Sequence, residues 1–467
     1  MKKVLFLIVS LALINFSCTE KKEKANEQNT QDVVKLITLD PGHFHAALVQ
    51  KTSYPQVSND VYIYAPESDD LEQHLKRIEG YNTRSESPTQ WNLIVYRGVD
   101  FFAKMIGEKK GNVMVTAGNN GKKTAYIKEA LQAGINVLAD KPMVIRNNDF
   151  QMLKECFEIA QKNNLMLYDI MTERFEIASI LQKEFSLIPT VYGQQLQGTP
   201  EDPGIVKESV HHFLKTVSGN PLKRPAWFFD VEQQGGGIVD VATHLVDLVQ
   251  WECFPEQIIN YETDIKLVDA NHWATPMTIE QFEKITGLKE FPDYLQNAVA
   301  DGVLQVFANG DITYQLKGLY AKVIAIWDYT YPEGGGDTHY SIMKGSRSHL
   351  IIEQGREQNY IPSLTIKKSD SEIKADDFEK ELIASLTVIN AKYPGVTVSK
   401  RDKDTWLVNI PDKYHIGHEA HFGQVTENFL RFLKDKKLPD WEVPNMIAKY
   451  YTTTQALQMA KSKPVKK

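Results

Sequence analysis

The sequence predicts an α/β fold in two parts: a doubly wound parallel sheet, followed by a region of mixed helices and strands. First, apolar runs of strand length alternate with helical spans between residues 33 and 139. Such alternation is typical of a parallel sheet with helices on both faces. Second, this alternation gives way to mixed helix and strand patterns from about Arg174 onward. Third, the length of 467 residues suits two domains with full cores.

Five apolar runs predict the strands of the parallel sheet, in chain order residues 33–40, 60–65, 91–96, 112–117 and 135–139. Between the last two runs, residues 123–133 predict a helix that ends at Gly134, because glycine commonly closes helices. Ligands of such sheets bind at the carboxyl ends of the strands. We therefore expect Asp140-Lys141-Pro142, which follow the fifth run, to lie at the ligand site.

The second part contains further strand-like runs, at residues 190–198, 302–308, 312–319, 322–329 and 363–367. Residues 421–433 have the apolar spacing of a helix, at Phe422, Val425, Phe429 and Phe432. We expect this helix to pack back against the domain and to have a structural role.

A glycine-rich stretch, residues 235–247 (GGGIVDVATHLVD), carries the strongest chemical signal. Asp240 and His244 are four residues apart, so they share one face if the segment is helical. A buried acid beside a histidine holds the imidazole in one tautomer, and the histidine can then carry a proton. Lys141 would add a fixed positive charge beside that pair. Lys141, Asp240 and His244 are therefore the predicted catalytic residues.

In this order, Asp140-Lys141-Pro142, Arg174-Phe175, the segment 224–227 (RPAW) and the glycine-rich stretch resemble the Gfo/Idh/MocA family of nicotinamide-dependent sugar and cyclitol dehydrogenases. The resemblance runs from about Val33 to Pro255. It implies a dinucleotide-binding Rossmann domain over residues 34–172. It also implies a substrate-binding α+β domain over residues 173–467, with a large, mostly antiparallel sheet that covers the nicotinamide.

The activity that the resemblance implies is hydride transfer between a sugar or glycoside hydroxyl carbon and a bound NAD or NADP. His244 would take the hydroxyl proton, and Lys141 would stabilise the developing alkoxide. Asp240 would orient the histidine or a second hydroxyl. The same fold also hosts NAD-dependent glycosidases that act through a transient 3-keto sugar. A third reading is a non-catalytic, sugar-binding relic of the fold.

The phosphate-binding turn departs from the Rossmann fingerprint G-x-G-x-x-G. Residues 40–47 (DPGHFHAA) offer Gly42 alone, and Asp40 would repel a pyrophosphate. After the second strand, Glu67 is the nearest acid that could bind ribose hydroxyls, which leans toward NAD. The residues expected to contact the cofactor are Gly42, His43, Phe44, His45, Glu67, Ala117, Asn119, Asn120, Asp140 and Lys141.

The residues expected to contact the sugar are Arg174, His212, Lys215, Trp227 and His418. Residues 209–215 alternate like a strand, so His212 and Lys215 cannot share one face of a regular strand. Trp227, Trp273 or Trp327 could supply the flat apolar face that sugars need. The cluster at residues 415–421 (HIGHEAH) leaves three readings open: a metal site, polar lining of a pocket, or surface and packing histidines. No metal ligand is assigned.

The first residues predict a targeting segment. A basic start and a short apolar run lead to a loose lipobox at Cys18, so residues 1–17 are a predicted lipoprotein signal peptide and 18–33 a flexible tether. The alternative is a plain signal peptide with a chance cysteine. We expect an exported bacterial lipoprotein, membrane-anchored through Cys18 and facing the periplasm or exposed on the cell surface. Cys156 and Cys253 are expected to be separate core residues rather than a disulfide.

Export constrains the cofactor, because free NAD is scarce outside the cytoplasm. We therefore expect a tightly held nicotinamide that is reduced and reoxidised in place, as in the periplasmic glucose–fructose oxidoreductase of the resembled family. The net charge of −7 offers no basic field for nucleic acid. The expected partners are a small carbohydrate, the lipid anchor and further copies of this chain in a homo-oligomer.

Overall fold

A computed structural model describes residues 33–217 and 220–463 of the chain. The predictions for the signal peptide, Cys18 and nearly all of the tether concern residues 1–32, which lie outside the described residues. The described residues from Val34 onward form one compact unit. Among the described helices, none combines the length and the apolar character needed to cross a bilayer.

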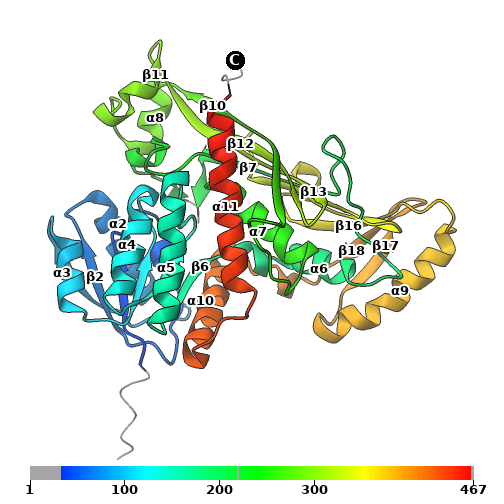
Figure 1. The fold of residues 1–467 in the computed structure, drawn as a ribbon, viewed down its shortest axis with the longest axis horizontal. Helices are drawn as coiled ribbons and strands as arrows, with labels where there is room; N and C mark the ends of the chain where they lie inside the picture. Colours follow the sequence, from blue (N-terminus) through cyan, green and yellow to red (C-terminus); the bar gives the residue numbers. More distant parts are fainter. Residues whose placement is uncertain (1–32, 218–219, 464–467) are drawn as a thin grey trace, which may run out of the picture. The chain divides into compact units, whose positions relative to one another are not determined.

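The first part is a six-stranded parallel sheet in the order β3-β2-β1-β4-β5-β6 (Figure 1). This confirms the predicted doubly wound sheet. The strands are β1 Leu36–Leu39, β2 Asp60–Ala65, β3 Asn92–Arg97, β4 Val113–Thr116, β5 Asn136–Asp140 and β6 Leu167–Ile170. The strand order reverses between β1 and β4, and such a switch point is where ligands of open parallel sheets bind.

Five helices connect these strands. They are α1 His45–Leu48, α2 Asp69–Thr83, α3 Phe101–Glu108, α4 Asn120–Gln132 and α5 Phe150–Lys162. The helix predicted at residues 123–133 is α4, which begins three residues earlier. Every residue of β1 and β4 is buried, because helices cover both faces of the sheet.

The second part is built on a ten-stranded sheet in the order β10-β12-β13-β7-β14-β15-β16-β18-β17, with β11 paired to β12. All its described pairs are antiparallel except β13 with β7, which confirms the expected α+β domain. Its strands are β7 Ile205–Leu214, β10 Ile265–Met277, β11 Val299–Ala300, β12 Val303–Leu316, β13 Leu319–Thr330, β14 Thr338–Lys344, β15 Ser348–Gln354, β16 Ser363–Lys368, β17 Thr397–Lys400 and β18 Thr405–Asn409. A separate short pair is β8 Thr216–Val217 with β9 Asn220–Pro221.

Two strand predictions in the second part need correction. Residues 190–198 form turns and irregular backbone rather than a strand, with isolated bridges at Gln195 and Gly198. Gly193 and Gly198 have φ of 76° and 70°, which extended backbone does not allow. The runs 302–308 and 312–319 belong largely to one long strand, β12.

Helices α6 Ile177–Ser186, α7 Ala242–Cys253, α8 Ile279–Thr286, α9 Ala375–Lys392, α10 His418–Asp435 and α11 Glu442–Lys461 complete the fold. The predicted helix at 421–433 lies within α10. Phe422, Val425 and Phe429 of α10 are buried in the core of the parallel sheet, while α11 packs between α5 and α7 (Figure 1). The C-terminal chain therefore completes the core of the first part.

A buried ion network joins the two parts. Arg174, just after β6, donates to Asp247 of α7 at 2.6 Å and to Glu442 of α11 at 2.9 Å. Lys449 of α11 lies 2.7 Å from Asp169 of β6 and 2.8 Å from Asp247. Because each buried charge here contacts an opposite charge, the network fixes α7 and α11 against the parallel sheet.

Candidate active site

A cavity of about 560 Å³ is lined by residues of both parts. On one side are the turn after β1 and the end of β5, at the switch point of the parallel sheet. On the other side are β7, β13, β14 and the start of α10. Of the predicted catalytic residues, Lys141, Asp240 and His244 all line it. The structure therefore brings together side chains that are up to 103 positions apart in the chain.

Lys141 and Asp240 form a close ion pair inside this cavity. The Lys141 Nζ donates to Asp240 Oδ1 at 2.5 Å, and both side chains are almost fully buried. Asp240 precedes α7, which begins at Ala242, so Asp240 and His244 do not share one helical face. The predicted arrangement, with Asp240 orienting His244, is thus replaced by one in which Asp240 holds the lysine.

His244, the third predicted catalytic residue, has one ring nitrogen without a hydrogen-bond partner. Its Nδ1 is buried and has no hydrogen-bond partner among the described residues. Burial, and then the positive charge of Lys141, hold the pKa of His244 well below its usual range. The imidazole is therefore neutral at pH 7 and able to accept a proton from a hydroxyl in the cavity.

The turn after β1 differs from a glycine-rich phosphate cradle in structure as well as in sequence. Gly42 N donates to the Asp40 carbonyl at 2.8 Å, and His43 N donates to the Ala117 carbonyl at 3.0 Å. A Cβ at Gly42 would come within 2.8 Å of the Trp227 ring. The helix that follows, α1, has only four residues. Two backbone N–H groups of this turn are thus already used by the protein itself.

Cationic side chains lie beside the turn instead. Arg77, Lys223 and Arg224 line a small cavity of about 20 Å³ together with Gly42, and its walls share His43 with the large cavity. Guanidinium and ammonium groups are the usual partners of phosphate. Asp70 lines the same small cavity, and Arg224 also donates to the carbonyls of Phe213 and His212. The three cations are the residues that would hold the phosphates of a dinucleotide. Such contacts differ from the backbone contacts of the Rossmann fingerprint.

The other predicted cofactor residues are placed as follows. Glu67 is exposed at the end of β2 and pairs with Arg97 at 2.8 Å. The Asn119 side chain donates to Gln233 Oε1 at 2.7 Å, and the Asn120 side chain donates to the Gln234 carbonyl at 2.7 Å. These two amides therefore hold the segment before the glycine-rich stretch rather than facing the large cavity.

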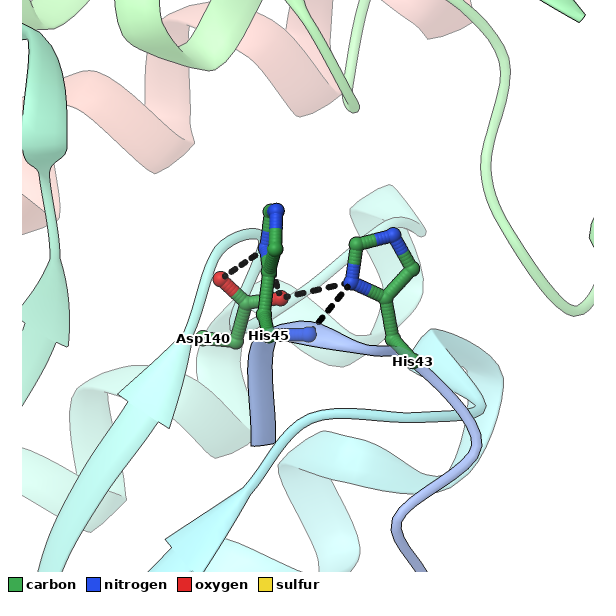
Figure 2. A group of neighbouring side chains, drawn as sticks. All are labelled: His43, His45 and Asp140. Carbon is green, nitrogen blue, oxygen red and sulfur yellow. Dashed lines mark hydrogen bonds and ion pairs between the residues drawn. The ribbon is translucent and has the colours of Figure 1, made fainter. Parts of the chain in front are cut away.

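His43, His45 and Asp140, which we call the turn cluster, converge at the carboxyl edge of the sheet (Figure 2). His45 Nδ1 lies 3.1 Å from Asp140 Oδ2, and His43 Nδ1 lies 3.8 Å from the same oxygen. Both histidines line the cavity next to Lys141. Burial is the main cause that holds the pKa of both imidazoles well below the usual range.

A second group, which we call the strand cluster, consists of His211 and His212 of β7, Lys215 and Asp337. Asp337 contacts His212 Nδ1 at 3.0 Å, His211 Nδ1 at 3.3 Å and Lys215 Nζ at 2.7 Å. Because β7 ends at Leu214, Lys215 is free of the strand alternation and reaches the same carboxylate as His212. His211, Lys215 and Asp337 line the cavity, whereas His212 is not part of its wall.

The remaining predicted substrate residues divide between the cavity and the protein interior. His418 lines the cavity at the start of α10. Arg174 belongs to the buried ion network and is absent from the cavity wall, which corrects its predicted substrate role. Trp227 donates from Nε1 to Asp70 at 2.9 Å, outside the cavity, and Trp327 supplies the aromatic wall instead.

Several cavity residues were not predicted from the sequence. They are His211, Asp337, His339, Glu173 and Glu176. Glu176 caps the start of α6, where its side chain accepts from Ser179 N at 2.9 Å, and burial raises its pKa to about 7.

The segment 415–421 also lines the cavity, through His415, His418, Glu419 and His421. Among the described residues, the group whose ligand atoms converge closely enough for a metal is the turn cluster, not this segment.

Comparison with known proteins agrees with this architecture. Residues 27–169 match the family described as "Oxidoreductase family, NAD-binding Rossmann fold", and residues 181–461 match "Putative oxidoreductase C terminal domain". A crystal structure of a protein from Parabacteroides merdae, described as a putative oxidoreductase, is 61% identical, with a TM-score of 0.91 over 93% of this chain and 98% of that one. The chain belongs to the Gfo/Idh/MocA oxidoreductase family. The curated proteins contain no match.

More distant structures share the fold of this family member. A biliverdin reductase from Synechocystis, in complex with biliverdin and NADP+, is 12% identical, with a TM-score of 0.53 over 92% of this chain and 99% of that one. The 3-ketoreductase KijD10 from Actinomadura kijaniata, in complex with TDP-benzene and NADP, is 11% identical, with a TM-score of 0.53 over 92% and 98%. This chain is thus an oxidoreductase-family protein with an NAD(P)-binding fold.

Proposed function

We propose that this protein oxidises or reduces a hydroxyl-bearing carbon of a sugar or glycoside, with a tightly held NAD or NADP as redox partner. The observation that carries the proposal is that His244, whose imidazole is neutral at pH 7, lines the same cavity as the Lys141–Asp240 ion pair. The cavity wall is rich in polar groups and includes Trp327, a composition that suits a sugar.

The protein's own residues would act on the proton and on the substrate oxygen. His244 accepts the hydroxyl proton during oxidation and returns it during reduction. The Lys141 ammonium, held by Asp240, stabilises negative charge on the same oxygen. Arg77, Lys223 and Arg224 would hold the cofactor phosphates, and Glu67 its ribose. The bound nicotinamide supplies the hydride chemistry.

The proposal extends to the location of the enzyme. The lipobox-like segment ending at Cys18 supports an exported lipoprotein, anchored in a membrane and facing the periplasm or the cell surface. An exported enzyme has no free NAD pool, which supports a cofactor that stays bound between turnovers. Radiolabelled palmitate incorporation into the wild-type chain but not into Cys18→Ala tests the anchor. Equal labelling of both would contradict it.

One observation favours a second candidate, an NAD-dependent glycosidase. Glu176 lines the cavity with a pKa raised to about 7 by burial, so it can donate a proton to a leaving-group oxygen at neutral pH. Nitrophenyl glycosides distinguish the candidates. Release of nitrophenol without net NADH identifies a glycosidase, whereas NADH or a keto sugar without nitrophenol identifies a dehydrogenase.

The test of the main proposal begins with the purified full chain. Denaturation followed by mass spectrometry should release NAD or NADP close to one equivalent per chain. His244→Ala and Lys141→Ala should each lower turnover on a panel of sugars by roughly 10² to 10⁴-fold, because both act on the substrate oxygen. Their cofactor content should remain that of the wild type.

The matched control is His272→Ala, a histidine of β10 that does not line the cavity. It should keep the wild-type rate. Since Lys141 lowers the pKa of His244, residual activity of Lys141→Met should fall at a higher pH than wild-type activity as the solution is acidified. Wild-type turnover in the His244 and Lys141 variants would contradict the assignment, and absence of any bound or acquired cofactor would favour the sugar-binding relic.

A further inference from the structure

We propose that the turn cluster is a binding site for one divalent transition-metal ion, with His43, His45 and Asp140 as ligands. One ring nitrogen of each histidine and a carboxylate oxygen all lie within 4.8 Å of one another. Figure 2 shows both imidazole rings turned toward the same carboxylate from one short turn. This site stands at the position where the family's glycine-rich turn is missing.

The donor set suits such an ion. Two imidazole nitrogens and one carboxylate bind first-row transition metals and leave coordination positions open. Ligands about 2.1 Å from a shared ion lie roughly 3 Å apart. The 3.1 Å and 3.8 Å separations from Asp140 Oδ2 to His45 and His43 are close to that spacing. To complete the set, His43, the more exposed of the two histidines, would move inward, and its Nδ1 would exchange the hydrogen bond that it accepts from His45 N at 3.4 Å for the ion.

The surrounding structure holds the three ligands in place. His43 N is bonded to the Ala117 carbonyl, which fixes the turn to the end of β4. The His45 ring packs against Phe422 of α10, with centroids 4.6 Å apart. Lys123 Nζ donates to the Asp140 backbone carbonyl at 2.8 Å, which leaves the Asp140 carboxylate to the histidines. Ligands held in this way need little reordering when an ion binds.

The charges at the site are compatible with a cation. The positive charge of Lys141 is compensated by Asp240. Lys123 donates to the Asp140 backbone carbonyl, so among the described residues no ammonium contacts the Asp140 carboxylate. That carboxylate is therefore the group that a cation would meet.

His43 and His45 line the cavity, so the open coordination positions would face the space shared with Lys141 and His244. A ligand in these positions would be an oxygen of the substrate, such as one of two neighbouring hydroxyls of a sugar. This role rests on the proposed function, whereas the metal site itself does not. Metal binding and sugar turnover are therefore tested separately.

The test uses the full chain, freed of metal with a chelator and then titrated with Zn²⁺ or Co²⁺ by calorimetry. Without added cofactor or substrate, we expect one equivalent per chain, and a Co²⁺ absorption spectrum indicative of nitrogen and oxygen ligands. His45→Ala and Asp140→Asn should each weaken binding at least tenfold, since even loss of an outer-shell partner costs 10 to 100-fold. His272→Ala, outside the cavity, should bind like the wild type.

A wild-type chain that binds no ion, or variants that bind with unchanged affinity, would overturn the metal site. Circular dichroism checks that each variant is folded. Should Asp140→Asn fail to fold, His43→Gln, at the more exposed edge of the cluster, gives the same answer. Because the titration measures metal binding and not turnover, failure here leaves the oxidoreductase proposal standing, and loss of turnover alone leaves the metal site standing.

Discussion

The turn cluster and the strand cluster have the same core composition, two histidines and one aspartate, but different charge balance. In the strand cluster, Lys215 Nζ lies 2.7 Å from the Asp337 carboxylate. In the turn cluster, no ammonium of the described residues contacts the Asp140 carboxylate, because Lys123 binds the Asp140 backbone carbonyl instead. The protein thus supplies its own cation to one aspartate and not to the other.

This difference is the reason why we propose a metal ion for the turn cluster and not for the strand cluster. A buried carboxylate needs a positive partner or a full set of hydrogen-bond donors. Asp337 has both a lysine and two imidazoles, and these hold its pKa well below the usual range although burial alone would raise it. Asp140 has two imidazoles that burial keeps neutral. An internal lysine therefore closes the strand cluster, and an external cation can complete the turn cluster.

The largest effect expected from disturbing this balance is that of Asp337→Asn. The substitution leaves Lys215 and two imidazoles facing a neutral amide, so the free energy of unfolding should fall by about 1.5–3 kcal/mol at pH 7. Urea denaturation measures it. Because the folded pKa of Asp337 is lowered, this stabilisation is present above its unfolded pKa of about 3.9 and is lost as the pH falls through the folded value.

The control for this variant is Asp328→Asn, an exposed aspartate on the neighbouring β13. A loss in Asp337→Asn no larger than in Asp328→Asn would mean that the strand cluster contributes little to stability. Metal affinity of Asp337→Asn should stay at the wild-type value, since the turn cluster is intact.

Lys215→Met should give the strand cluster the charge balance of the turn cluster, with no ammonium beside its carboxylate. Without its ammonium, the Asp337 carboxylate keeps two imidazole neighbours at 3.0 Å and 3.3 Å and lacks a cation. We expect a second equivalent of Zn²⁺ in calorimetry, bound at least tenfold more tightly than any second ion in the wild type, which corresponds to about 1.4 kcal/mol. Unchanged stoichiometry would show that lysine is not what keeps metal out.

The parallel sheet could be predicted because most of its strands are short apolar runs. β1 and β4 are buried at every residue, whereas β3, at the edge of the sheet, is half-buried or exposed. The sixth strand, β6, was missed since Asp169 interrupts its apolar pattern. That charge is compensated by Lys449, 280 positions further along the chain, at 2.7 Å. The same distance in sequence hides the role of Arg174, whose partner Glu442 lies on the last helix. Local patterns report burial, but they do not report which distant charge makes burial possible.

The candidate site could be predicted only in part, because local patterns do not show which distant residues meet. Lys141 and His244 stand in recognisable motifs, and the structure places both at the cavity. The two clusters are not visible in the sequence, because Asp140 and Asp337 are 95 and 125 positions from the histidines they contact. The available signals were two histidines just after the first predicted strand and two histidines within the strand-like residues 209–215. Only the fold shows which acid each pair meets.

The smallest effect concerns His74 of α2, a buried histidine without an acidic partner in the structure. Neither ring nitrogen has a hydrogen-bond partner among the described residues, and burial lowers its pKa to about 3. The unfolded chain binds a proton near pH 6.5, so this histidine withdraws stability as the pH falls below that value. Between pH 7.5 and 5.5 the loss is roughly 1.4 kcal/mol, and His74→Leu should remove it.

Urea denaturation at both pH values measures the difference between His74→Leu and the wild type, with the exposed His415→Leu as control. An equal pH dependence in wild type and His74→Leu would mean that His74 is protonated in the folded state. Burial alone would then be insufficient to keep a histidine neutral here, and the contrast between the two clusters would depend on their acids more than on their burial.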